Sequence, residues 1–183
     1  KQYPDSDSLK RTEVKVLLAL GQIDEALIKL RDNSEALKFD DNMLILFSQL
    51  ELGDKQVDAA ARIINEMVLK SPNDPSVIAV SAGVDYQRKE FDSAERKLIK
   101  AIEIEPKFIP LYVNLHYVYV AKGKHKQALE VLTKALSVSP ENANLWIKLG
   151  DFSAQLNNHK IASSWYRKAF DKTQNNKLAM LKL

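Results

Sequence analysis

The sequence reads FDSAERKLIKAIEIEP from Phe91 to Pro106 and HKQALEVLTKALSVSP from His125 to Pro140. The second stretch begins 34 residues after the first and repeats its alanine, leucine and proline positions. Self-similarity at a fixed period of this size is typical of helical repeat proteins, in which each repeat is one supersecondary unit. The period therefore predicts a chain built from repeated pairs of helices.

The same period runs through the chain well beyond these two stretches. Alanine recurs every 34 residues, at Ala26, Ala60, Ala94, Ala128 and Ala162. Large apolar residues recur at Leu30, Ile64, Leu98, Leu132 and Tyr166, and proline recurs at Pro72, Pro106 and Pro140. We interpret the alanines as the places where two helix backbones come close.

One unit, 109–142, shows the expected anatomy. Two helices are predicted at 111–122 and 126–139, with a tight turn at Gly123 between them and Pro140 closing the unit. Helices joined by so short a turn lie antiparallel, and neighbouring pairs must stack to bury their apolar faces. The sequence therefore predicts an all-α fold, an α-solenoid of antiparallel helix pairs.

The joints between units carry helix-start signals. Asn73 or Asp74 is expected to cap the next helix, with Pro75 in its first turn, where a missing amide donor is harmless.

Composition excludes several classes of protein. The 183 residues include 27 basic and 24 acidic side chains, a net charge of +3 that is too balanced to indicate a nucleic-acid partner. With no cysteine, the chain has no disulfide framework or thiolate metal site, and cytoplasmic and bacterial periplasmic locations are both compatible. No run approaches the roughly 18 apolar residues of a membrane helix.

The last complete unit carries a family pattern at Trp146, Leu149, Gly150, Ala162, Tyr166 and Ala169. This pattern resembles the tetratricopeptide repeat (TPR), although Ser153 stands where the family usually has tyrosine. The resemblance implies a right-handed superhelix in which the first helix of each pair lines a concave groove. It also implies a single array over 1–176, with units near 7–40, 41–74, 75–108, 109–142 and 143–176, and the start of a further helix at 177–183.

The resemblance further implies which residues line the groove. The expected partner-binding residues are Ile45, Gln49, Tyr86, Val113, Tyr117, Val120, Asn144, Ile147 and Asp151. Members of the family generally bind proteins and are not enzymes, so we expect a peptide or helix of a protein partner in this groove.

The helix after Pro110 supports a binding surface without the family. Its two sides are both apolar, and only Asn114 and His116 interrupt them. A helix that is apolar all round is normally buried. Either a partner or a neighbouring segment covers its second side, or tight curvature of the array buries that side internally.

A two-carboxylate clamp for chaperone tails, known in some TPR proteins, is not assembled here. Asn114 and Lys148 suit such a clamp, but Ala79, Gly83 and Asn144 stand where lysine, asparagine and lysine are required. An adaptor for chaperone tails is therefore not expected.

Catalytic and metal-binding patterns are not found in the sequence. His125 and His159 fall in equivalent turns, and no second histidine lies four residues from any of the three. A basic cluster at Lys122, Lys124 and Lys126 is interrupted by acidic residues such as Glu95 and Glu130, which indicates an ordinary solvated face. We predict no enzyme activity, cofactor, metal or nucleic-acid partner.

Two functional hypotheses follow. The first is a protein-binding scaffold with a partly apolar groove. The second is a recruiting or regulatory arm of a larger enzyme, or of a bacterial envelope system for secretion or polysaccharide export. The apolar end at 177–183 is expected to continue the array or to pair with a second copy of the chain.

Overall fold

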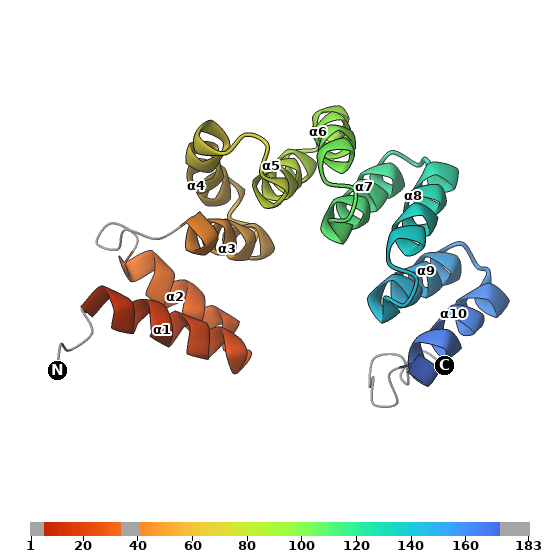
Figure 1. Cartoon of the computed structure of the whole chain (residues 1–183), viewed down its shortest axis with the longest axis horizontal. Coiled ribbons are helices and arrows are strands. Elements are labelled where there is room, and N and C mark those ends of the chain that lie inside the picture. The colour runs from red at the N-terminus through yellow and green to blue at the C-terminus, as the bar shows by residue number, and fades with distance from the viewer. Residues whose placement is uncertain (1–5, 34–40, 173–183) are drawn as a thin grey trace. The chain divides into compact units, whose positions relative to one another are not determined.

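A computed structural model describes residues 6–33 and 41–172, with the side chains of Ser6 and Asp7 left aside. These residues form helices and short turns, and no strand occurs among them, which confirms the all-α fold (Figure 1). The chain divides into two compact units, Lys1–Lys89 (unit 1) and Glu90–Leu183 (unit 2), which we describe separately. The division falls inside the predicted repeat 75–108, and the single five-repeat array stays a prediction. The predicted helix at 177–183 lies outside the described residues.

Consecutive helices pair in both units. Unit 1 holds α1 (Ser6–Ala19), α2 (Ile23–Asn33), α3 (Asp41–Gly53), α4 (Val57–Lys70) and α5 (Pro75–Gln87). Unit 2 holds α6 (Phe91–Ile104), α7 (Ile109–Ala121), α8 (His125–Val138), α9 (Ala143–Gln155) and α10 (His159–Lys172). The helices predicted at 111–122 and 126–139 are α7 and α8, with bounds shifted by no more than two residues.

The turns between paired helices share one backbone conformation. A residue with positive φ recurs every 34 residues, at Gly21, Lys55, Lys89, Gly123 and Asn157, with φ between 61° and 76°. The turn predicted at Gly123 is thereby confirmed, with φ of 69°. The amide of the following Lys124 donates to the carbonyl of Tyr119 at 2.8 Å, which closes the end of α7 as in a Schellman motif. Lys55, Lys89 and Asn157 adopt the same conformation at a steric cost that glycine avoids.

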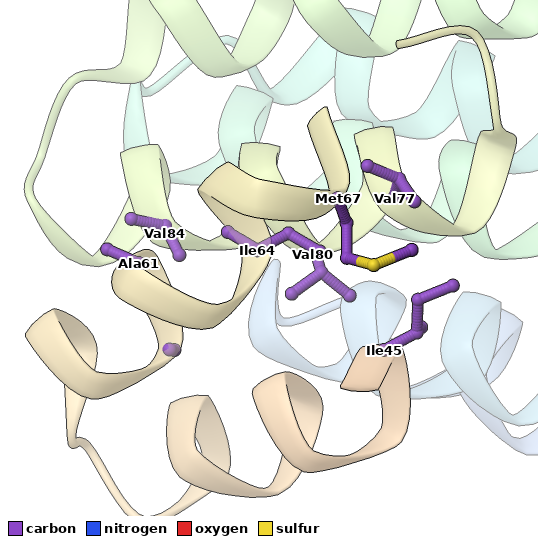
Figure 2. Close-up of a cluster of buried hydrophobic side chains, with 8 residues drawn as sticks. Ile45, Ala61, Ile64, Met67, Val77, Val80 and Val84 are labelled. Carbon is purple, nitrogen blue, oxygen red and sulfur yellow. The ribbon is translucent and has the colours of Figure 1, made fainter. Parts of the chain in front are cut away.

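The repeated residues form the core, as predicted. The five alanines of the 34-residue register are at most 3% exposed, and the four aliphatic residues that follow them, Leu30, Ile64, Leu98 and Leu132, are at most 1% exposed. Figure 2 shows part of this core in unit 1, where α3, α4 and α5 bring together Ile45, Ile64, Met67, Val77, Val80 and Val84. Removing these side chains from water is the main stabilising contribution to each helix pair.

The joints between helix pairs are capped by side chains. The Asp74 carboxylate accepts hydrogen bonds from the amides of Ser76 and Val77 at 2.7 and 3.2 Å, so Asp74, not Asn73, is the cap. Asn142 does the same for α9, through the amides of Asn144 and Leu145. These bonds satisfy amide groups that have no partner inside the helix.

An ion cluster that the repeat pattern does not predict joins α2 to α3. The Arg31 guanidinium donates to both carboxylate oxygens of Glu51, at 2.9 and 2.7 Å, and also to Asp54 at 2.8 Å. The Glu51 side chain is only 2% exposed, so Arg31 supplies its compensating charge. A buried carboxylate without such a partner is strongly unfavourable.

Replacing Ala128 with leucine should lower the free energy of unfolding by about 1–3 kcal/mol, because the added atoms have no space where α7 and α8 meet. Ala19→Leu, at an exposed alanine of α1, is the control and should have little effect. Urea denaturation followed by circular dichroism measures both. Equal stability of Ala128→Leu and wild type would show that the helix backbones are not in close contact there.

Replacing Arg31 with methionine should cost about 1–3 kcal/mol, since it leaves the buried Glu51 carboxylate unpaired. The double variant Arg31→Met/Glu51→Leu should recover much of that loss, because it removes both charges. Arg88→Met is the matched control: Arg88 pairs with Asp58, whose side chain is 93% exposed, and such pairs contribute little. Equal urea midpoints for Arg31→Met and Arg88→Met would contradict the role given to the α2–α3 cluster.

Candidate partner-binding surface

The predicted binding residues lie on four helices, two in each unit. In unit 1, α3 carries Ile45 and Gln49, and α5 carries Tyr86. In unit 2, α7 carries Val113, Tyr117 and Val120, and α9 carries Asn144, Ile147 and Asp151. Because the two units are described separately, each group of residues is considered within its own unit.

Helix α7 has one buried side and one partly open side within unit 2. Its buried residues are Leu111, Tyr112, Leu115, His116, Val118 and Tyr119. On the other side Tyr117 is 44% exposed, and Val113 and Val120 are half-buried. Unit 2 therefore leaves open an apolar patch of Val113, Tyr117 and Val120, which we call the α7 surface.

Tyr117 is held in place by helix α9. The Lys148 ammonium donates a 2.8 Å hydrogen bond to the Tyr117 hydroxyl and lies 5.1 Å from the centre of its ring. Both contacts come from one lysine across neighbouring helices, so Tyr117 is an exposed aromatic side chain with a fixed orientation. A rigid exposed aromatic ring is well suited to binding because little conformational freedom remains to be lost.

Two of the predicted binding residues are core residues, which corrects their assignment. Ile147 is 4% exposed and packs with Trp146 and Tyr166, and Ile45 is 9% exposed within the core shown in Figure 2. Both are branched aliphatic side chains on the first helix of a pair, and both are oriented toward neighbouring helices. Neither side chain is available to a partner.

The remaining predicted residues are polar or partly exposed. Asn144 and Gln49 are exposed, and Tyr86 is half-buried. Asp151 accepts a 2.8 Å hydrogen bond from the Tyr166 hydroxyl. Burial, together with this bond to a carboxylate, raises the pKa of Tyr166 to about 12. Asp151 therefore has a packing role between α9 and α10, whatever else it contacts.

The buried histidine of α7 has a role that sequence reasoning missed. The His116 side chain is 5% exposed, its ring lies edge-on to Phe152 at 4.8 Å, and its Nδ1 is 3.0 Å from the Ala128 carbonyl oxygen. A carbonyl only accepts, so Nδ1 carries the proton and donates. Burial lowers the pKa of His116 below 6.5, and the nearby Lys148 charge lowers it further, although the Ala128 hydrogen bond opposes this.

The basic cluster of unit 2 is paired with acidic side chains. Lys122 forms hydrogen-bonded ion pairs with Asp92 and Glu95, and Lys124 lies 3.6 Å from Glu95. These pairs raise the pKa of Lys122 and lower that of Asp92. The lysines thus link α6 to the end of α7, as expected of a surface on which acidic residues interrupt the basic ones.

Other kinds of site have no counterpart in the part of the chain that the structure describes. No group of three or more histidine, aspartate or glutamate side chains there is placed to hold a metal ion. Among the described helices, none combines the length and the apolar character needed to cross a membrane.

Comparison with known proteins points to one family. A family model described as tetratricopeptide repeat matches residues 119–183. Small glutamine-rich tetratricopeptide repeat-containing protein 2 of Saccharomyces cerevisiae is 28% identical over 92 residues, which are 50% of this chain and 27% of that protein. BBSome complex member BBS4 of Bos taurus is 32% identical over 114 residues, 62% of this chain and 20% of that protein. The chain therefore spans less than a third of the length of these relatives.

Solved structures agree on the fold. A thermophilic TPR protein from Thermus thermophilus superposes with a TM-score of 0.82, covering 97% of this chain and 96% of that chain. Its sequence is 18% identical, so this likeness concerns the fold alone.

The buried His116 should make stability depend on pH. Its pKa is lower in the folded chain than in the unfolded chain, so the unfolded chain binds more protons once the pH falls below about 6.5. The free energy of unfolding should therefore fall as the pH drops through that window. Urea denaturation from about pH 8 to about pH 5 measures this dependence.

Two variants separate His116 from other titrating groups. His116→Gln retains a donor for the Ala128 carbonyl and should flatten the pH dependence near pH 6, whereas His125→Gln, at an exposed position, should keep the wild-type slope. An unchanged slope in His116→Gln would show that another group is responsible.

Proposed function

We propose that this chain, which belongs to the tetratricopeptide-repeat family, is a non-enzymatic scaffold whose α7 surface binds a peptide or helix of a protein partner. Proteins of this family are generally protein–protein interaction scaffolds. BBS4, one of the relatives, is named as a member of a complex, which is consistent with a scaffold role.

The observation that carries the proposal is the exposure of Tyr117 on an otherwise apolar helix. An exposed tyrosine flanked by two half-buried valines is an unusual use of surface for a helix whose other side is core. Tyrosine is enriched at the energetic centres of interfaces, because it contributes a large apolar area and a polar hydroxyl at low entropic cost. A partner side chain that packs on Tyr117 would bury apolar area on both molecules.

The polar neighbours of the α7 surface would orient the partner. Lys148 is tied to the Tyr117 hydroxyl, and Asn144 is exposed one turn earlier on α9. An ammonium and an amide beside an apolar patch can bond the backbone carbonyls of a bound peptide. With Ile45 and Ile147 assigned to the core, the proposed contacts in unit 2 are Val113, Tyr117, Val120 and Asn144. Gln49, Tyr86 and Asp151 stay predictions.

The alternative setting, a recruiting or regulatory arm of a larger enzyme or of an envelope export system, also stays a prediction. It is compatible with the same α7 surface, because either setting requires a protein partner. The sequences surrounding this segment in its gene would distinguish the two.

Replacing Tyr117 and Val120 together with serine should weaken partner binding at least tenfold, because it removes most of the exposed apolar area of the α7 surface. Peptides selected against the 183-residue chain from a random display library provide the ligands, and fluorescence anisotropy measures their affinity.

The far-UV circular dichroism of this variant should match that of wild type, since both side chains are at least partly exposed. Leu69→Ser/Ile104→Ser is the matched control, because it removes two exposed apolar side chains elsewhere. If the selected peptides bind the Tyr117→Ser/Val120→Ser variant as tightly as wild type, the α7 surface is not the binding site.

A further inference from the structure

A second side of helix α7 forms the floor of a pocket in unit 2. The pocket has a volume of about 290 Å³ and lies where α6, α7 and α8 meet. Its deepest residues are Tyr112, Leu115 and Tyr119, which are at most 8% exposed, and Ile102 and Val131 form apolar walls. Tyr112, Leu115 and Tyr119 follow one another at helical spacing, on a different side of α7 from Val113, Tyr117 and Val120. The α6–α8 pocket is therefore separate from the α7 surface.

The floor of the pocket is fixed by contacts of its own. The Tyr112 hydroxyl donates a 2.8 Å hydrogen bond to the Pro106 carbonyl, and the Lys124 ammonium lies 5.7 Å from the centre of the Tyr119 ring. These contacts hold both rings where they are, so the cavity is preformed. A preformed apolar cavity binds a side chain without the cost of ordering its own walls.

The entrance of the pocket is polar and biased toward negative charge. Its exposed lining residues are Ile99, Glu103, Gln127, Glu130 and Lys134. Glu103 has no hydrogen-bond or ion-pair partner in the described part of the chain. Glu130 has only Lys126, 4.0 Å away, and both side chains of that pair are well exposed. Two carboxylates therefore stand against the single ammonium of Lys134, in a chain whose overall charge is positive.

We propose that the α6–α8 pocket binds a partner segment that presents one or two leucine-sized side chains next to lysine or arginine. The volume lies at the lower end of the range for small-molecule pockets, which suits one or two aliphatic side chains. The apolar floor and walls bury those side chains, while Glu103 and Glu130 attract the flanking positive charge. Lys134 and Gln127 are placed to bond carbonyl groups of the segment's backbone.

The test uses a defined peptide and the whole 183-residue chain. The probe is a fluorescein-labelled, end-capped helical peptide of alanine with two leucines spaced i, i+3 and flanked by lysines. We expect a dissociation constant on the order of 100 µM, as for a small contact. With isotope-labelled methyl groups, NMR should show saturable shifts at Ile99, Ile102, Leu115 and Val131, and none at Val113 and Val120.

Changes to the peptide and to the protein test the two parts of the proposal. Replacing both leucines of the peptide with alanine should weaken binding about tenfold or more, because the buried area is lost. Glu103→Lys/Glu130→Lys should weaken binding about fivefold at low salt, and less at high salt. Glu66→Lys/Asp171→Lys, which makes the same change in net charge at exposed positions outside the pocket, should change affinity less than twofold.

Several results would overturn the proposal. Equal binding by the alanine peptide would show that the pocket does not select aliphatic side chains. Equal binding by the Glu103→Lys/Glu130→Lys and Glu66→Lys/Asp171→Lys variants would remove the charge argument. Shifts confined to Val113 and Val120 would place the peptide on the α7 surface and leave the pocket unused. Pocket shifts that depend on protein concentration without peptide would identify a second copy of the chain as the occupant.

Discussion

The close approach of helix backbones at the repeated alanines is the contact on which the rest of the structure depends. Ala26, Ala60, Ala94, Ala128 and Ala162 are all essentially buried, and each is the first large contact point on the second helix of its pair. A small side chain there lets the larger residues four positions later, such as Leu98 and Leu132, reach the core. The left-handed turn residue five positions before each alanine returns the chain at the angle that makes this contact possible.

Because the repeated residues are used for packing, recognition depends on residues that are not repeated. On α7, the side with Tyr112, Leu115 and Tyr119 and the side with Val113, Tyr117 and Val120 are both apolar, and the structure gives them different environments. His116 separates the two sides and anchors the helix to α8 through the Ala128 carbonyl. One helix thus contributes to the core, to an exposed patch and to a pocket, and this explains why its sequence has so few polar residues.

The helix pairs could be predicted from sequence because their signals are local and recur. Alanine spacing, Gly123 and the Asp74 cap are each visible in a few residues, and the repeat shows the same signals several times. The left-handed turns at Lys55, Lys89 and Asn157 were not predicted, since these residue types do not normally mark such a turn; only their spacing from Gly21 and Gly123 indicates it. Gly150, part of the family pattern, has a reason visible only in the structure: a Cβ there would lie 2.3 Å from the Tyr166 ring.

The binding residues were harder to predict, because the family pattern assigns a position to a helix face without the reach of its side chain. Ile45 and Ile147 occupy positions that the family uses for binding, yet both side chains pack into the core. The Arg31–Glu51 cluster and the α6–α8 pocket join residues from different repeats, so no single repeat reveals them. A crystal structure of the whole chain with a peptide selected for binding tests the central claim most directly. The account predicts peptide density in contact with Tyr117, and a peptide bound elsewhere with Tyr117 bare would contradict it.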